Sequence, residues 1–66
     1  MNLDAMSHGE LIAIAQNERH DPNVRQYARH KARAMRHRVS GQIRNALDAE
    51  KYCDYLYTKI PVDLRW

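Results

Sequence analysis

The sequence predicts an all-α fold, a small three-helix domain in which a short N-terminal helix packs on a long antiparallel helical hairpin. Three segments place their apolar residues at helical spacing, and no segment alternates polar and apolar residues as a half-buried strand does. Hydrophobic residues make up 44% of the chain, with only two Gly and two Pro, which is typical of an ordered domain. Because 66 residues suffice for one small core only, we expect a single helical domain over residues 1–66.

The first helix is expected over residues 8–17. Ser7 and Glu10 have the spacing of a capping box, in which the Ser hydroxyl accepts from the Glu10 amide and Glu10 accepts from the Ser7 amide. Met6 and Leu11 occupy the positions of a hydrophobic staple around this cap. A short apolar stripe follows, formed by Leu11, Ile14 and Ala15.

The second helix is expected over residues 22–39. Asp21 can cap the free amides of its first turn, and Pro22 suits the first helical position because its φ is already set and it has no amide to leave unsatisfied. At 100° per residue, five apolar residues fall within about 80° of arc and predict one buried stripe. These residues are Val24, Ala28, Ala32, Met35 and Val39.

The third helix is expected over residues 42–60. Gly41 can take the left-handed conformation that closes the second helix, and Ser40 can cap the next one. An apolar series at helical spacing then continues until Pro61 stops the helix. Its members are Ile43, Ala46, Leu47, Cys53, Tyr57 and Ile60.

So short a connection requires the second and third helices to lie antiparallel. Folding the hairpin about the Ser40-Gly41 dipeptide puts Lys31 opposite Glu50, and Tyr27 or Ala28 opposite Asp54. We therefore predict that Lys31 and Glu50 form a structural ion pair, which contributes about 1 kcal/mol or less when it is solvated.

The charges are strongly polarised along the chain. Between Arg19 and Arg44 there are eight Lys or Arg residues and a single acid, Asp21, which gives this middle segment a net charge of +7. The remaining residues carry three basic and seven acidic side chains, a net charge of −4. Such a layout in a chain with no catalytic signature indicates a protein that docks on another macromolecule.

Four Arg residues of the second helix form one ridge at spacings i, i+4, i+8 and i+11. The ridge comprises Arg25, Arg29, Arg33 and Arg36. Because the same helix has almost no acid, the guanidinium groups of the ridge repel one another. An anionic partner is therefore favoured, either phosphates or a carboxylate-rich protein surface. The alternative is a solvated face whose charges serve solubility.

A second candidate surface lies on the third helix, where Tyr52 and Tyr55 point away from the apolar arc and are expected to be exposed. Tyr beside Arg or Lys is typical of interface centres, and Arg44 and Lys51 share this side with the two Tyr residues. The alternative is that these Tyr side chains are partly buried. At the end of the chain, Trp66 either folds back over the open end of the core or remains available to a partner.

The sequence argues against a metal site, a cofactor site and an active site. His30 and His37 are seven residues apart, about 10 Å along a helix, which is too far to share one ion. Cys53 lies on the predicted buried face, where a thiol is normally inert. Glu50 and Asp54 are one turn apart, but no concave site is implied around them. We therefore expect a non-enzymatic protein with no catalytic, metal-binding or cofactor-binding residues.

Nucleic acid is an alternative partner, because the sequence pI of 9.4 reaches the value at which such binding is suspected. A tight antiparallel hairpin does not suit sequence-specific reading, since a helix-turn-helix needs a wider turn between its helices. Non-specific binding of phosphates by the Arg ridge therefore remains as the alternative hypothesis.

We also expect a soluble, cytoplasmic protein that forms a homodimer. The longest apolar run, Leu11 to Ala15, is far below the roughly 20 residues that span a bilayer, and the N-terminus does not resemble a signal peptide. The single cysteine rules out an internal disulfide and points to a reducing compartment. Self-association is expected because the core is thin and the apolar arc of the third helix reaches Ala49 and Leu56, beyond what one partner helix covers.

Two resemblances add to these expectations. The segment from Gly41 to Leu47, followed by Cys53 and Pro61, resembles the second helix of a tetratricopeptide-type hairpin, which implies helical-hairpin packing and no function. The chain as a whole is similar to small accessory proteins of tailed bacteriophages. That likeness covers the Tyr27-Ala28, Lys31-Ala32 and Leu64-Arg65-Trp66 segments. It implies a stoichiometric binder that blocks a host enzyme, regulator or defence complex in the host cytoplasm.

The leading hypothesis is a non-enzymatic modulator or inhibitor that docks on a host protein with an acidic surface. The residues expected to contact it are Arg25, Arg29, Arg33, Arg36, Arg44, Tyr52, Tyr55 and Trp66. The first alternative is a non-specific nucleic-acid-binding protein that uses the same ridge. The second is a structural subunit of a larger assembly.

Overall fold

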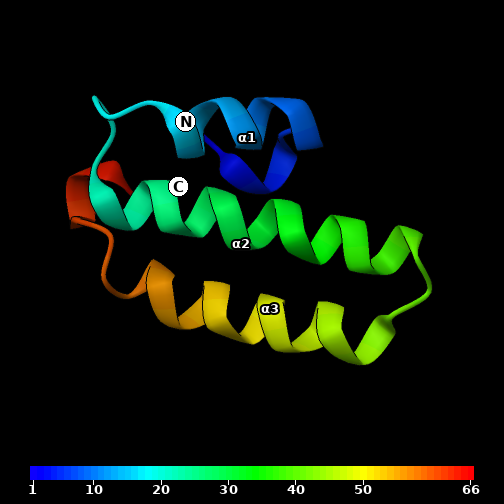
Figure 1. Ribbon diagram of the computed structural model, residues 1–66. Helices are drawn as coiled ribbons and strands as arrows, with labels where there is room; N and C mark the ends of the chain where they lie inside the picture. The colour runs from blue at the N-terminus through cyan, green and yellow to red at the C-terminus, as the bar shows by residue number, and fades with distance from the viewer.

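A central helix with one helix on either side organises the computed structural model, which describes all of residues 1–66 (Figure 1). The three helices are α1 (His8–Gln16), α2 (Pro22–Val39) and α3 (Ile43–Tyr57). Single 3-10 turns, η1 (Leu3–Ala5) and η2 (Val62–Leu64), lie near the two termini, and there are no strands. The all-α three-helix prediction is therefore confirmed. None of the helices is long and apolar enough to cross a membrane.

The first two helices begin where their caps predict. The Ser7 hydroxyl accepts from the Glu10 amide at 3.3 Å, and the Glu10 carboxylate accepts from the Ser7 amide at 3.0 Å, which completes the capping box. At the start of α2, Asp21 Oδ1 accepts from the Asn23 amide at 2.8 Å and Pro22 occupies the first turn. Local hydrogen bonds thus suffice to fix both starting points.

The turn between α2 and α3 depends on Gly41, whose φ of 76° lies in the left-handed region, as predicted. The Gln42 amide donates to the His37 carbonyl at 2.8 Å and the Gly41 amide donates to the Arg38 carbonyl at 3.1 Å, which is the Schellman pattern. The expectation that Ser40 caps the third helix is wrong. Ser40 ends α2, and α3 starts after Gln42 without any side-chain cap.

The third helix ends at Tyr57 and not at residue 60. Pro61 disfavours helical backbone in the residue before it, and the chain leaves the helix through a turn. The freed carbonyls find other donors, since the Arg65 guanidinium donates to the Ile60 carbonyl and to the Thr58 carbonyl, each at 3.0 Å. Arg65 therefore compensates for the early end of α3.

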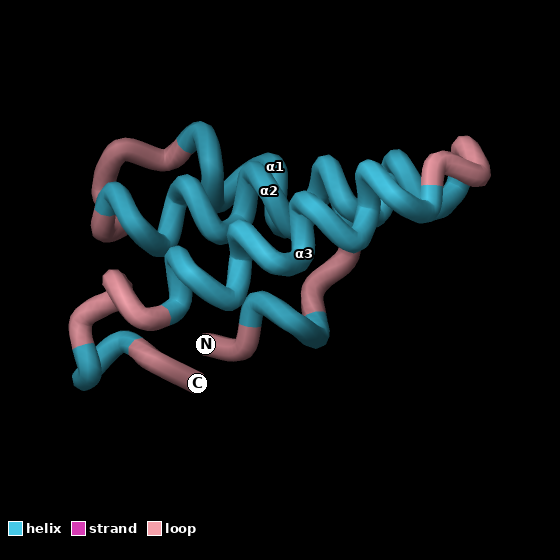
Figure 2. Tube along the Cα trace, turned by 90° about the horizontal axis from the view of Figure 1, so that it is seen from below, coloured by secondary structure: helices cyan, strands magenta, loops and turns pink.

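The core lies on both sides of α2, which packs against α1 and against α3 (Figures 1 and 2). Alanines on α2, such as Ala28 and Ala32, allow the neighbouring helices to approach closely. The main apolar cluster consists of Leu3, Leu11, Ile14, Ala15, Val24, Tyr27, Ala28, Ala32, Cys53, Leu56 and Ile60. Two stripes of α2 are thus buried, where the sequence pattern predicted one.

Some of the predicted core is exposed. Val39 belongs to the predicted stripe of the second helix but is 90% exposed, because α1 has nine residues against 18 in α2 and leaves the turn end of the hairpin uncovered (Figure 1). Ile43 and Leu47, at the same end, are also exposed. Ala49 and Leu56 are instead buried within the chain. Ala49 and Leu56 therefore no longer support the predicted homodimer, whose other basis was the thin core, and the homodimer stays an untested prediction.

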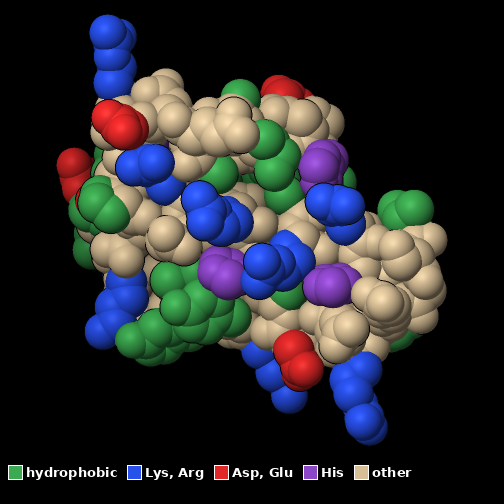
Figure 3. All heavy atoms as spheres, viewed as in Figure 1, with side chains coloured by type: hydrophobic (Ala, Val, Ile, Leu, Met, Phe, Trp, Pro, Cys, Tyr) green, Lys and Arg blue, Asp and Glu red, His purple; other side chains and the backbone are tan.

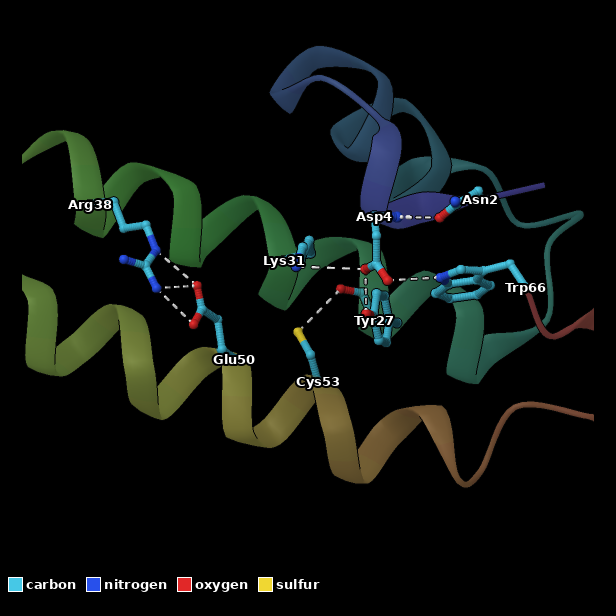
Figure 4. A network of polar contacts seen from close by, with 8 residues as sticks. All are labelled: Asn2, Asp4, Tyr27, Lys31, Arg38, Glu50, Cys53 and Trp66. Carbon is cyan, nitrogen blue, oxygen red and sulfur yellow. Dashed lines mark hydrogen bonds and ion pairs between the residues drawn. The ribbon is translucent and has the colours of Figure 1, made fainter.

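The predicted ion pair between Lys31 and Glu50 is wrong. The Arg38 guanidinium donates to both oxygens of Glu50, each at 2.8 Å, whereas Lys31 Nζ lies 3.6 Å from Asp4 Oδ1 (Figure 4). Side chains lean toward the N-terminus of their own helix, so Arg38 and Glu50 on antiparallel helices lean toward each other. Arg38 is also long enough to span the remaining offset along the hairpin.

The two termini meet at the Asp4 carboxylate (Figures 2 and 4). It accepts from the Tyr27 hydroxyl at 2.6 Å and from the Trp66 indole at 3.0 Å. The Trp66 ring also meets the rings of Tyr27 and Tyr57 edge to face, with centroids 4.9 Å apart in both cases. The tail therefore folds back over the open end of the core, which is the first of the two alternatives predicted for Trp66.

The charge state of Asp4 follows from these contacts. Burial favours the neutral carboxyl, but the hydrogen bonds from Tyr27 and Trp66 and the charge of Lys31 outweigh burial and lower the pKa of Asp4. A lowered pKa in the folded state means that the ionised carboxylate stabilises the fold above its ordinary pKa. This contribution is lost as the pH falls through the lower, folded value.

Replacing Asp4 by Asn should lower the free energy of unfolding by about 1–2 kcal/mol near neutral pH, a value kept small because half of the side chain is exposed. The difference from the parent chain should narrow as the pH falls through the lowered pKa of Asp4, because below it both chains are neutral at this position. Urea unfolding followed by circular dichroism, at neutral pH and along an acid series, measures it. Asp63→Asn, an exposed acid without an ion pair, is the matched control; an equal loss there would contradict the role of Asp4.

Candidate macromolecule-binding face

Three Arg residues of α2 lie exposed on one side of the molecule and have no partner within the chain. Arg29, Arg33 and Arg36 form neither ion pairs nor side-chain hydrogen bonds. Figure 3 shows Lys, Arg and His side chains gathered across the middle of this face. Without acids between them, the guanidinium groups produce a positive field that an anionic partner would relieve.

The first Arg of the predicted ridge differs from the other three. Arg25 is partly buried, and its Nε donates to the carbonyl of Ala15 at 3.1 Å. That carbonyl belongs to the last turn of α1, where carbonyls lack a partner within the helix. Arg25 therefore links the end of α1 to α2. Only three of the four Arg residues in the predicted ridge are free to contact a partner.

The two acids that form ion pairs with α2 do so away from the exposed Arg side chains. Asp4 pairs with Lys31 and Glu50 pairs with Arg38. Lys31 and Arg38 each lie two residues from an exposed Arg, a rotation of about 200° around the helix. The ion pairs of the fold thus occupy one face of α2, and the opposite face keeps its uncompensated charge.

A row of aromatic rings extends the basic side from α2 onto α3. The His30 ring meets Tyr52 edge to face with centroids 4.6 Å apart, and Tyr52 stacks on Tyr55 with centroids 5.9 Å apart. Lys59 Nζ lies 5.5 Å from the centre of the Tyr55 ring. Tyr52 is 45% exposed and Tyr55 is 54% exposed, so the exposure predicted for both is confirmed. We call Arg29, Arg33, Arg36, Tyr52 and Tyr55 the basic face.

The pKa of His30 reflects the positive charge of this surface. Burial lowers the pKa of His30, and the neighbouring guanidinium groups of Arg33 and Arg29 lower it further. His30 is therefore held neutral to lower pH than a free histidine. Its ring supports Tyr52 without adding charge to the basic face near neutral pH.

A hollow of about 370 Å³ lies beside the ridge, between α2 and the start of α1. It is lined by His8, Ile12, Arg29, Ala32, Arg33, Arg36, His37, Ser40 and Gln42. No acidic side chain takes part. His37 is held in place there, because its Nδ1 lies 2.8 Å from Gln42 Oε1.

Two of the predicted contact residues lie elsewhere. Arg44 lines a separate surface hollow together with Lys51 and three acids, Asp48, Glu50 and Asp54, so its surroundings are mixed in charge. Trp66 belongs to the aromatic cluster at Asp4. The structure therefore brings together Arg29, Arg33, Arg36, Tyr52 and Tyr55, and it separates Arg25, Arg44 and Trp66 from them.

Three histidines that the sequence did not assign to this surface lie on it: His8, His30 and His37. His30 and His37 share helical spacing with Arg33 and could have been assigned to the same side of α2. His8 could not, because it reaches the hollow only through the packing of α1 against α2. No group of three His, Cys, Asp or Glu side chains comes together as a metal site would require.

Cys53 has the environment of a packing residue. Its side chain is buried, with Sγ 3.8 Å from the Tyr27 carbonyl oxygen, and burial raises the pKa of the thiol to about 11. Very little thiolate is therefore present near neutral pH, and the sulfur donates to a backbone carbonyl.

Comparisons with known proteins return no match. No protein-family model matches the chain, and no curated protein and no solved structure shows significant similarity to it. The resemblances to tetratricopeptide hairpins and to phage accessory proteins are accordingly not tested by these comparisons.

Proposed function

We propose that this chain is a non-enzymatic protein that binds another protein through the basic face and modulates or inhibits it. The observation that carries the proposal is the set of three exposed Arg side chains without partners, on a helix whose other three cations all have one: Lys31 and Arg38 pair with acids, and Arg25 donates to a backbone carbonyl. Nothing in the fold requires these three charges. A partner with an acidic surface would supply the carboxylates that the chain itself directs elsewhere.

The composition of the basic face suits a protein interface. Arg and Tyr are enriched among the residues that contribute most to binding, and here they lie side by side on two packed helices. The edge-to-face contact of His30 with Tyr52 and the stacking of Tyr52 on Tyr55 restrict these rings before binding, which lowers the entropy lost when a partner orders them. The positive field of the Arg residues would also speed association with an acidic partner.

The resemblance to small accessory proteins of tailed bacteriophages adds an expectation about the partner. Proteins of that class act by occupying a host enzyme, regulator or defence complex. We accordingly propose a host protein with an acidic surface as the target, with stoichiometric blocking as the mechanism.

A second candidate function is non-specific binding of single-stranded nucleic acid. The observation that favours it is the pair of exposed, stacked Tyr rings, Tyr52 and Tyr55, beside a row of Arg residues. Bases stack on such rings whatever their sequence, while Arg neutralises the phosphates. The protein-binding proposal is preferred because the unpaired Arg residues of α2 number only three, which is a small set of phosphate contacts for a polyanion.

The protein-binding proposal predicts that Arg29→Ala, Arg33→Ala and Arg36→Ala together lower partner capture from nuclease-treated cell extract at least tenfold. Quantitative mass spectrometry of the captured proteins measures the change. The matched control removes three other exposed positive charges, with Arg19→Ala, Arg44→Ala and Lys51→Ala, and should capture the partner as the parent chain does. Unchanged capture by the first variant, with its helical circular dichroism intact, would contradict the proposal.

The nucleic-acid candidate predicts a salt-dependent affinity for a labelled single-stranded oligonucleotide. Three phosphate contacts give a slope of log affinity against log salt of about −2. Tyr52→Ala should weaken the binding further, because a stacking ring contributes about 1–3 kcal/mol per base. Fluorescence anisotropy from about 50 mM salt upward measures both effects, and no binding at the lowest salt would dispose of this candidate.

A further inference from the structure

The hollow between the start of α1 and α2 has the chemistry of an anion site. Three guanidinium groups and two imidazoles converge on it, together with the Ser40 hydroxyl and the Gln42 amide, and no carboxylate lines it. Its volume of about 370 Å³ accommodates a side-chain-sized group and not just a single ion. Like charges drawn together around a concave surface repel one another until an anion enters.

His8, at the start of α1, lines the hollow and is partly buried. Its Nε2 is shielded from solvent and has no hydrogen-bond partner. A shielded polar atom without a partner costs free energy. His8 is also the first residue of α1, next to the capping box of Ser7 and Glu10, so its backbone position is fixed. The amide end of the helix contributes partial positive charge at the same place.

His37 is the second imidazole of the hollow, and Gln42, which also lines the hollow, holds it in place. Its Nδ1 lies 2.8 Å from Gln42 Oε1, so the other ring nitrogen remains for a ligand. Gln42 sits just beyond the Gly41 turn that fixes the end of α2. Both imidazoles are therefore placed by capping structures at the helix ends, one of α1 and one of α2.

We propose that this hollow binds the phosphate group of a phosphorylated side chain on the partner protein. A phosphate monoester has close to two negative charges and three terminal oxygens, which can use the three Arg residues and the two histidines together. A carboxylate has two oxygens and one charge, and a single Arg in bidentate geometry satisfies it. A nucleic-acid strand has one charge per phosphate and extends over many residues, whereas these donors surround one concave site.

The inference rests on the proposed function, because the phosphate is taken to belong to the protein that docks on the basic face. Recognition of phosphorylated motifs by Arg clusters is a recurrent mode of protein binding. Arg29, Arg33 and Arg36 belong both to the hollow and to the basic face, so a partner can insert one phosphate while the surface around it covers Tyr52 and Tyr55.

A titration with a short phosphoserine peptide and its unphosphorylated serine twin, followed by amide chemical shifts in NMR, tests the site. The phosphopeptide should bind at least tenfold more tightly than its twin, with the largest shifts at His8, Arg36 and His37. Arg36→Ala should weaken its binding at least tenfold, and Arg44→Ala should leave it unchanged. Equal binding of the two peptides, or shifts spread evenly over the basic residues, would overturn the inference. Tighter binding of a short oligonucleotide in the hollow would also overturn it.

Phosphatase treatment of the extract separates this inference from the function on which it rests. If the inference holds, capture of the partner by the parent chain should fall at least tenfold after treatment. Undiminished capture from treated extract, together with its loss in the variant without Arg29, Arg33 and Arg36, would overturn the phosphate site and leave the proposed function standing.

Discussion

The Asp4 carboxylate is the contact on which the rest of the fold depends. It joins the N-terminal 3-10 turn to Tyr27 and Lys31 of α2 and to Trp66 at the end of the chain. A domain of 66 residues buries a thin core, and its open end is covered here by the tail and by edge-to-face rings. Contacts that hold both termini on the central helix thus contribute stability that a larger apolar core would otherwise provide.

The Asp4–Lys31 contact and the Arg38–Glu50 ion pair together explain why the Arg residues of the basic face have no partner. Asp4 and Glu50 are engaged with Lys31 and Arg38 on one side of α2, so these acids do not reach the Arg side chains on the other. The charge asymmetry of the sequence thereby becomes an asymmetry between two faces of one helix. One face stabilises the fold, and the other keeps a positive field that costs a little stability and favours an anionic partner.

Local signals in the sequence were sufficient for the helix starts and for the turn. Ser7, Asp21 and Gly41 act through hydrogen bonds or backbone conformation within a few residues, which do not depend on packing. Contacts between distant segments were not predictable in the same way. Lys31 was assigned the wrong acid because the 3-10 turn that presents Asp4 has no periodic pattern.

The candidate site shows the same division. Helical spacing placed Arg29, Arg33 and Arg36 on one side of α2, but it also included Arg25, whose hydrogen bond to α1 depends on how two helices pack. The contribution of His8 depends on the same packing. The central claim is that the fold does not need the three exposed Arg charges. The free energy of unfolding of the variant in which Ala replaces these Arg residues tests it most directly. We expect stability equal to or slightly above that of the parent chain in urea unfolding, because repulsion between the guanidinium groups is removed and Ala favours the helix. A loss of about 1 kcal/mol or more would show that the fold needs these charges and would contradict the account.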